Sequence, residues 1–173
     1  MIPQIKKILY TTDLSDNSTE VFKYTMNSAK KYEAGIIVLH VLEPLPTTVN
    51  AITHSYLTEG QVNKISEERL AYVNDRVKKQ LKTFCENELK NDPECADRVE
   101  SIELREGFPA EMILRISDEL NCDAIIMGTH GKGFIRNTFL GSTSKRVLRR
   151  TRKPVFIIPL PGEEADIGLS DVE

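Results

Sequence analysis

Apolar residues follow two different periods along this chain. In one kind of segment they occupy consecutive positions, which is typical of strands that are covered on both faces of a sheet. In the other kind they recur every three or four positions, which predicts helices with one apolar face. The first pattern is found in residues 6–12, 35–42, 123–127 and 154–160, and residues 99–104 alternate as an edge strand does. The second pattern is found in residues 18–31, 62–89, 109–120 and 142–150.

The boundaries of these segments carry further signals. Ser15, Asp16 and Asn17 are typical N-cap residues before the first helix. The pair Asp92-Pro93 ends the second helix, and Pro109 stands in the first turn of the third. Residues 43–60 contain two prolines and no clear period, so we expect a long loop there, of the kind that forms lids or binding loops.

Strands and helices alternate from the first element to the last. This order predicts a doubly wound, Rossmann-like α/β fold, with a five-stranded parallel sheet in the strand order 3-2-1-4-5 and helices on both faces. The chain has 173 residues, of which 40% are apolar, and this is enough for one domain with its own core. We assign residues 1–160 to that domain and residues 161–173 to an acidic, flexible tail.

The cysteines and the apolar runs indicate the compartment. Cys85, Cys95 and Cys122 are odd in number and form no C-x-x-C pair, which argues against a disulfide framework or a structural zinc site and favours reduced thiols. No apolar run approaches the roughly 20 residues that cross a bilayer. The first residues lack the pattern of a signal peptide. We therefore expect a cytoplasmic protein that makes no contact with membranes.

The formal net charge of −3 is unevenly distributed. The last 13 residues carry five acids and no base, which leaves a charge of +2 for the other 160. Residues 132–153 carry eight bases and no acid, so we expect anions to bind there. A solvated helix face is the usual explanation for such arginines. No recognition motif or interleaved aromatic residues accompany the bases, so we do not expect nucleic-acid binding.

Ligands of doubly wound sheets bind beyond the carboxyl ends of the strands, where the strand order reverses. Here that point lies between the first and the fourth strands. The first strand ends in Thr11, Thr12 and Asp13, and the fourth runs into Gly128-Thr129-His130-Gly131-Lys132-Gly133. The last helix begins with Gly141-Ser142-Thr143-Ser144. Glycines let the backbone approach a ligand closely, and a helix N-terminus with hydroxyl groups suits phosphate.

Two common phosphate-binding motifs do not fit this region. The sequence has no G-x-x-x-x-G-K-[ST] string, and Arg136 stands where a dinucleotide-binding loop that begins at Gly131 needs its third glycine. The remaining spacing is G-x2-G-x9-G-S, at Gly128, Gly131, Gly141 and Ser142. It resembles the nucleotide-binding signature of the universal stress protein family. The resemblance extends over residues 3–160 and includes KKILYTTD near the start, LHV at 39–41 and RKPVFIIP at 152–159.

The ATP-binding branch of that family implies a role for each matching segment. Asp13, with Thr11 and Thr12 beside it, would lie at the nucleoside, and the backbone of Val41 would meet adenine. The residues from Gly128 to Gly133 and from Gly141 to Ser144 would hold ribose and phosphates, with Lys132 paired to a phosphate. Mg²⁺ would be carried on the phosphates. The resemblance also implies a homodimer that forms through the last strand.

Several of these residues also have ordinary structural interpretations. Asp13 beside Ser15 and Asn17 is common cap chemistry, and its place at the strand reversal is what favours a ligand role. For His130, contact with a ligand and a role as a cap or solvent-facing residue are equally consistent with the sequence. His40 lies within an apolar strand, so we expect a buried histidine whose hydrogen bonds are satisfied.

Three functions fit these observations. The first is a stress-response regulator that binds ATP, in which occupancy shifts the 43–60 loop or the dimer surface and hydrolysis is slow or absent. The second is an ATPase or nucleotidyl-transfer enzyme on the same fold, and the third is a scaffold whose site is vestigial. We favour the first, because no pattern in the sequence positions a general base or a nucleophile. We assign no catalytic residue.

Overall fold

The computed structural model describes residues 2–15, 17–44, 49, 51, 55–88, 97–130 and 140–160. Within them, five parallel strands form one sheet in the order β3-β2-β1-β4-β5. The strands are β1 (Lys7–Thr12), β2 (Gly35–Leu42), β3 (Val99–Glu106), β4 (Ala124–Gly128) and β5 (Val155–Ile158). The predicted α/β class and strand order are confirmed, and β5 lies at an edge of the sheet.

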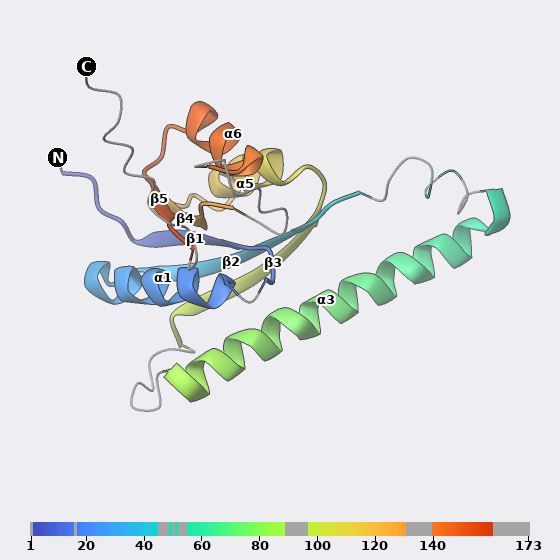
Figure 1. Ribbon diagram of the computed structural model, residues 1–173, viewed down its shortest axis with the longest axis horizontal. Helices are drawn as coiled ribbons and strands as arrows, with labels where there is room; N and C mark the ends of the chain where they lie inside the picture. Colours follow the sequence, from blue (N-terminus) through green and yellow to red (C-terminus); the bar gives the residue numbers. More distant parts are fainter. Residues whose placement is uncertain are drawn as a thin grey trace, which may run out of the picture.

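Helices cover both faces of this sheet (Figure 1). The helices α1 (Ser18–Tyr32) and α3 (Glu59–Glu88) pack on one face, and α5 (Pro109–Glu119) and α6 (Ser142–Arg150) pack on the other. Each face has its own apolar core. Along β1, Ile8 and Tyr10 belong to the first core and Leu9 belongs to the second. Because alternate side chains of a strand point to opposite faces, a strand between two cores needs the unbroken apolar run that the sequence has.

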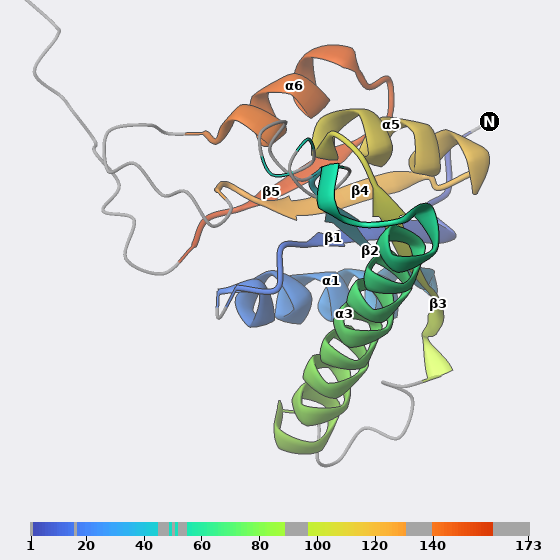
Figure 2. The same cartoon turned by 90° about the vertical axis from the view of Figure 1, so that its right-hand side faces the viewer.

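Helix α3 extends well beyond the sheet that it covers, as Figures 1 and 2 show. Its C-terminal half is anchored in the first core by Val77 and Phe84, and the ring of Phe84 meets that of Phe22 edge-on at 4.7 Å. The helix begins three residues before the predicted start. The N–H and Oγ1 of Thr58 donate to Oε1 of Gln61 at 2.9 and 3.1 Å. In a capping box the side chain three residues into the helix accepts from the N–H of the cap residue, and Gln61 does this for Thr58.

The segment before α3 differs from the expected loop. Four described residues in it, Val49, Ala51, Ser55 and Tyr56, have helical backbone, and Oγ of Ser55 donates to the carbonyl of Ala51 at 2.7 Å. The prediction of a segment without helix is therefore wrong at these positions. All four side chains are exposed, so no apolar period marks them in the sequence.

Two further expectations concern caps and cysteines. Asn17 makes no side-chain cap hydrogen bond to α1; the backbone N–H of Ser18 donates instead to the carbonyl of Ser15 at 3.1 Å.

Cys85 is disulfide-bonded, so the expectation of reduced thiols is wrong for this residue, because an odd cysteine count still allows one pair. Cys122 is a free, buried thiol.

The remaining expectations concern membrane-spanning helices and the C-terminal tail. No helix among the described residues is both long and apolar enough to cross a membrane. The acidic tail, residues 161–173, lies outside the described part of the chain.

Candidate functional site

A cavity of about 390 Å³ lies at the carboxyl ends of β1, β2 and β4. Its volume falls within the range of small-molecule sites, roughly 300–1,000 Å³. The strand order reverses between β1 and β4, so the cavity occupies the place where a doubly wound sheet binds ligands. Residues of α1, α3, α5 and α6 complete its wall.

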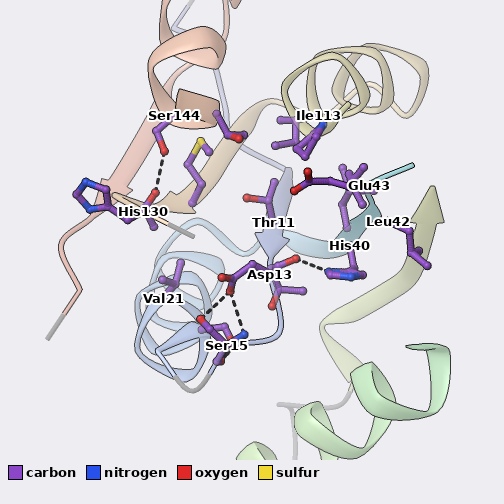
Figure 3. A pocket seen from close by; sticks show the side chains of 18 of the residues that line it. Thr11, Asp13, Ser15, Val21, His40, Leu42, Glu43, Ile113, His130 and Ser144 are labelled. Atoms are coloured by element: carbon purple, nitrogen blue, oxygen red, sulfur yellow. Dashed lines mark hydrogen bonds between the residues drawn. The ribbon is translucent and has the colours of Figure 1, made fainter. Parts of the chain in front are cut away.

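Asp13 follows β1 and lies in the middle of the cavity wall (Figure 3). Its Oδ1 accepts hydrogen bonds from the N–H and the Oγ of Ser15, at 3.0 and 2.7 Å. Its Oδ2 is buried and has no hydrogen-bond partner among the described residues. A buried polar atom without a partner costs about 1–3 kcal/mol. A ligand that donates a hydrogen bond to Oδ2 would remove this cost.

The backbone beside Asp13 adopts an uncommon conformation. Leu14 has a φ of 59°, in the left-handed region that few residues other than glycine enter. Two contacts hold it there: its N–H donates to Oγ1 of Thr12 at 3.1 Å, and its side chain is buried in the first core. The turn that presents Asp13 is thus fixed before any ligand arrives.

His40 of β2 is buried, and its Nδ1–H donates to the carbonyl of Thr12 at 2.7 Å. The expectation of a buried, hydrogen-bonded histidine is confirmed. The ring also lines the cavity, and its bond to Thr12 ties the end of β2 to the strand that carries Asp13.

The N-terminus of α6 forms another part of the wall. The N–H of Gly141 donates to the carbonyl of Thr129 at 2.8 Å. The buried hydroxyl of Ser144 contacts the carbonyls of Gly128 and Thr129, both at 3.1 Å. These bonds hold the segment after β4 against α6. The hydroxyl proton of Ser144, which the sequence assigned to a phosphate, is therefore directed at the protein backbone.

Comparison with known proteins agrees with the observed fold. The universal stress protein family model matches residues 4–159. The chain belongs to the universal stress protein family. It is 29% identical over 153 residues to universal stress protein MJ0577 of Methanocaldococcus jannaschii, covering 88% of this chain and 94% of that protein. The structure of UspA from Lactobacillus plantarum is 19% identical with a TM-score of 0.67, covering 91% of this chain and 99% of that one. A universal stress protein in complex with cAMP is 22% identical with a TM-score of 0.51, covering 91% and 98%.

The structure of this universal stress protein brings many of the predicted site residues together. Those that line the cavity are Thr11, Thr12, Asp13, Val41, Gly128, His130, Thr143 and Ser144. Gly131, Lys132 and Gly133 lie outside the described residues.

Three predicted residues are not part of the cavity lining, namely Thr129, Gly141 and Ser142. Thr129 is buried. A Cβ placed on Gly141 would lie 3.2 Å from the carbonyl oxygen of Thr129. The close approach at Gly141 is therefore to the protein's own backbone.

Two charged residues of the cavity wall, Glu43 and Arg69, were missed by the sequence analysis. Arg69 of α3 lines the cavity and is the only lysine or arginine among its described lining residues. The basic residues of the 145–153 segment do not line it, and the expectation that anions bind at the basic run stays a prediction. The spacing of Arg69, four residues before the half-buried Val73, places it at the margin of the apolar face of α3. No motif distinguishes it.

Proposed function

We propose that this universal stress protein binds ATP in the cavity at the carboxyl end of the sheet, and that occupancy acts as a conformational or oligomerisation switch in a stress response. Hydrolysis without a partner is slow or absent. The observation that supports this most strongly is the buried Oδ2 of Asp13, which has no partner among the described residues and belongs to a cavity of nucleotide size. A nucleoside supplies the hydroxyl and amino donors that a carboxylate needs.

Each part of the nucleotide has a chemically suitable neighbour in the proposal. Asp13 accepts from ribose hydroxyls or from the amino group of adenine, and the backbone of Val41 meets the base. The phosphates lie toward the N-terminus of α6, where unpaired N–H groups and the helix dipole favour anions, with Thr143 as a hydroxyl donor. Gly131, Lys132 and Gly133 belong to this phosphate-binding part of the proposal. Mg²⁺ is held by phosphate oxygens and water, since it gives up its waters reluctantly.

One observation supports an adenine nucleotide as the ligand, and another supports a homodimer. A protein of the same family and fold has been solved with cAMP. The strand β5 is an edge of the sheet, and its residues Val155, Phe156 and Ile157 are only half-buried, so a second copy could cover them. We propose a cytoplasmic homodimer that pairs through β5.

The first experiment is calorimetric titration of the purified full-length protein with ATP, ADP, AMP, cAMP and GTP. We expect binding of adenine nucleotides with ATP preferred, and a change in light-scattering mass or in tryptic cleavage on ATP addition. Absence of heat with all adenine nucleotides, in a protein that circular dichroism shows to be folded, contradicts the proposal. Phosphate release at about 1 s⁻¹ or faster would favour the ATPase instead.

A further inference from the structure

Arg69 lies at the end of the cavity away from α6. Its Nη2 donates to the carbonyl oxygen of Glu43, just after β2, at 3.0 Å. Its Nη1 lies 3.8 Å from Oε1 of Glu106, at the end of β3. Figure 3 shows Glu43 on one side of Asp13, and His130 and Ser144 on the other. The guanidinium is thus anchored to Glu43 and Glu106, at the β2–β3 end of the cavity.

The charges around Arg69 argue against a phosphate at this end. Asp13 and Glu43 line the cavity, and Glu106 is paired with the guanidinium. The cavity lining thus holds two carboxylates and a third lies 3.8 Å from the guanidinium, so a phosphate beside Arg69 would meet a net negative charge. At the α6 end, no described lining residue of β4 or α6 is acidic, and the helix dipole is favourable to anions. The two ends of the cavity thus differ in what they can hold.

The shape and the donors of the guanidinium suit a different group. It is planar, stacks on flat aromatic rings and carries five N–H donors, of which the structure directs one at Glu43 within the described residues. Val41, Leu42 and Val73 line the cavity nearby on β2 and α3, and they provide apolar surface. A neutral, planar, hydrogen-bond-accepting ring satisfies both the apolar wall and the guanidinium without adding charge.

We propose that Arg69 is the base-recognition residue of this site, and that its guanidinium stacks on, or donates to, the purine ring of the bound nucleotide. This inference rests on the proposed nucleotide-binding function. It assigns α3, a helix outside the glycine signature, a direct part in selecting the ligand. Glu106 lies beside the guanidinium and weakens its attraction for phosphates, so the contribution of Arg69 is to the base.

The test compares three probes that separate the base from the phosphates: ATP, adenosine and inorganic tripolyphosphate. Each is titrated calorimetrically into the full-length protein and its Arg69→Ala variant. We expect the variant to bind ATP and adenosine about tenfold more weakly, as the loss of a partly desolvated cation–π contact predicts, and to bind tripolyphosphate unchanged. Arg69→Lys keeps the charge but not the planar group, and we expect it to bind adenosine more weakly than the native protein, because an ammonium does not stack on a ring as a guanidinium does.

The control is Lys64→Ala, which removes an exposed cation of the same helix that lies 4.0 Å from Glu68. We expect unchanged affinity for all three probes. If Arg69→Ala does not fold, Arg69→Lys provides the same comparison. Equal affinity of the native protein and both Arg69 variants for adenosine overturns the inference alone. A loss confined to ATP and tripolyphosphate also overturns it, since Arg69 would then be a phosphate contact. Failure of the native protein to bind ATP or adenosine overturns both proposals.

Discussion

Asp13→Asn separates a ligand-binding role of this residue from a structural one. The substitution keeps an oxygen for the two bonds from Ser15, at 3.0 and 2.7 Å, and replaces the buried Oδ2 with an amide group. Asp123→Asn is a matched control at the opposite end of β1. There Oδ2 of Asp123 accepts from the backbone N–H groups of Lys6 and Lys7, at 2.8 and 2.9 Å.

The expected magnitudes follow from these contacts. In Asp13→Asn the bonds from Ser15 lose their charge assistance, which costs about 1 kcal/mol. Removing a buried charge without a partner offsets this, so the free energy of unfolding should change by about 1 kcal/mol or less. Asp123→Asn has no such offset and should lose about 1–2 kcal/mol. A bond from a nucleotide donor to the Asp13 carboxylate is worth about 1.5–3 kcal/mol, so ATP affinity should fall about 10- to 150-fold in Asp13→Asn alone.

Urea denaturation gives the free energies of unfolding, and calorimetric titration gives the ATP affinities. The reasoning is refuted if Asp13→Asn loses 2 kcal/mol or more of stability, on the order of a buried hydrogen bond to a charged group, and keeps its ATP affinity. Asp13 would then be a structural cap. It is equally refuted if Asp123→Asn loses as much ATP affinity as Asp13→Asn, because the effect would then come from general destabilisation.

Three further predictions concern stability. Burial raises the pKa of the Cys122 thiol to about 11 from its ordinary value of 9.0, so the unfolded chain releases this proton first and the free energy of unfolding should fall as pH rises from 9 toward 11. Cys122→Ala should flatten that slope in urea titrations, and an unchanged slope contradicts the assignment. Glu33 ends α1 with a φ of 53°, so Glu33→Gly should stabilise the protein by about 0.5–1 kcal/mol in thermal unfolding; a lower melting temperature argues otherwise. Ser144→Ala leaves two carbonyls without their hydroxyl donor and should cost about 1–2 kcal/mol, which an unchanged urea midpoint would disprove.

The fold could be predicted from the sequence because its strands are buried between two cores. Each face of β1 and β2 meets apolar side chains, so the run at 35–42 identifies a strand almost to the residue. Where the structure relies on polar contacts between exposed residues, the apolar pattern carries no information. The capping of α3 by Thr58 and Gln61 and the helical residues 49 and 51 belong to this second kind.

The candidate site also has a part that the sequence predicts and a part that it does not. Glycines and hydroxyls at fixed spacing predicted a site beside β4 and α6, where Gly128, Thr143 and Ser144 line the cavity but Gly141 and Ser142 do not. Spacing cannot reveal that Ser144 gives its proton to carbonyls, since a hydroxyl serves a ligand and a backbone equally well. Nor can it reveal Arg69, which reaches Glu43 and Glu106 only because α3 packs across the β2–β3 end of the sheet.

The central position of β1 has a consequence for biosynthesis. On one side Lys7 pairs with Gly35, soon after both are made, while on the other Ile8 pairs with Ala124. During translation one edge of β1 therefore has no strand partner until β4 leaves the ribosome, and open apolar edges invite pairing between nascent chains. The cavity wall runs from Thr11 to Leu160, so it forms only when the last strands dock. A ligand can therefore stabilise the nascent chain only after β4 and β5 have been made.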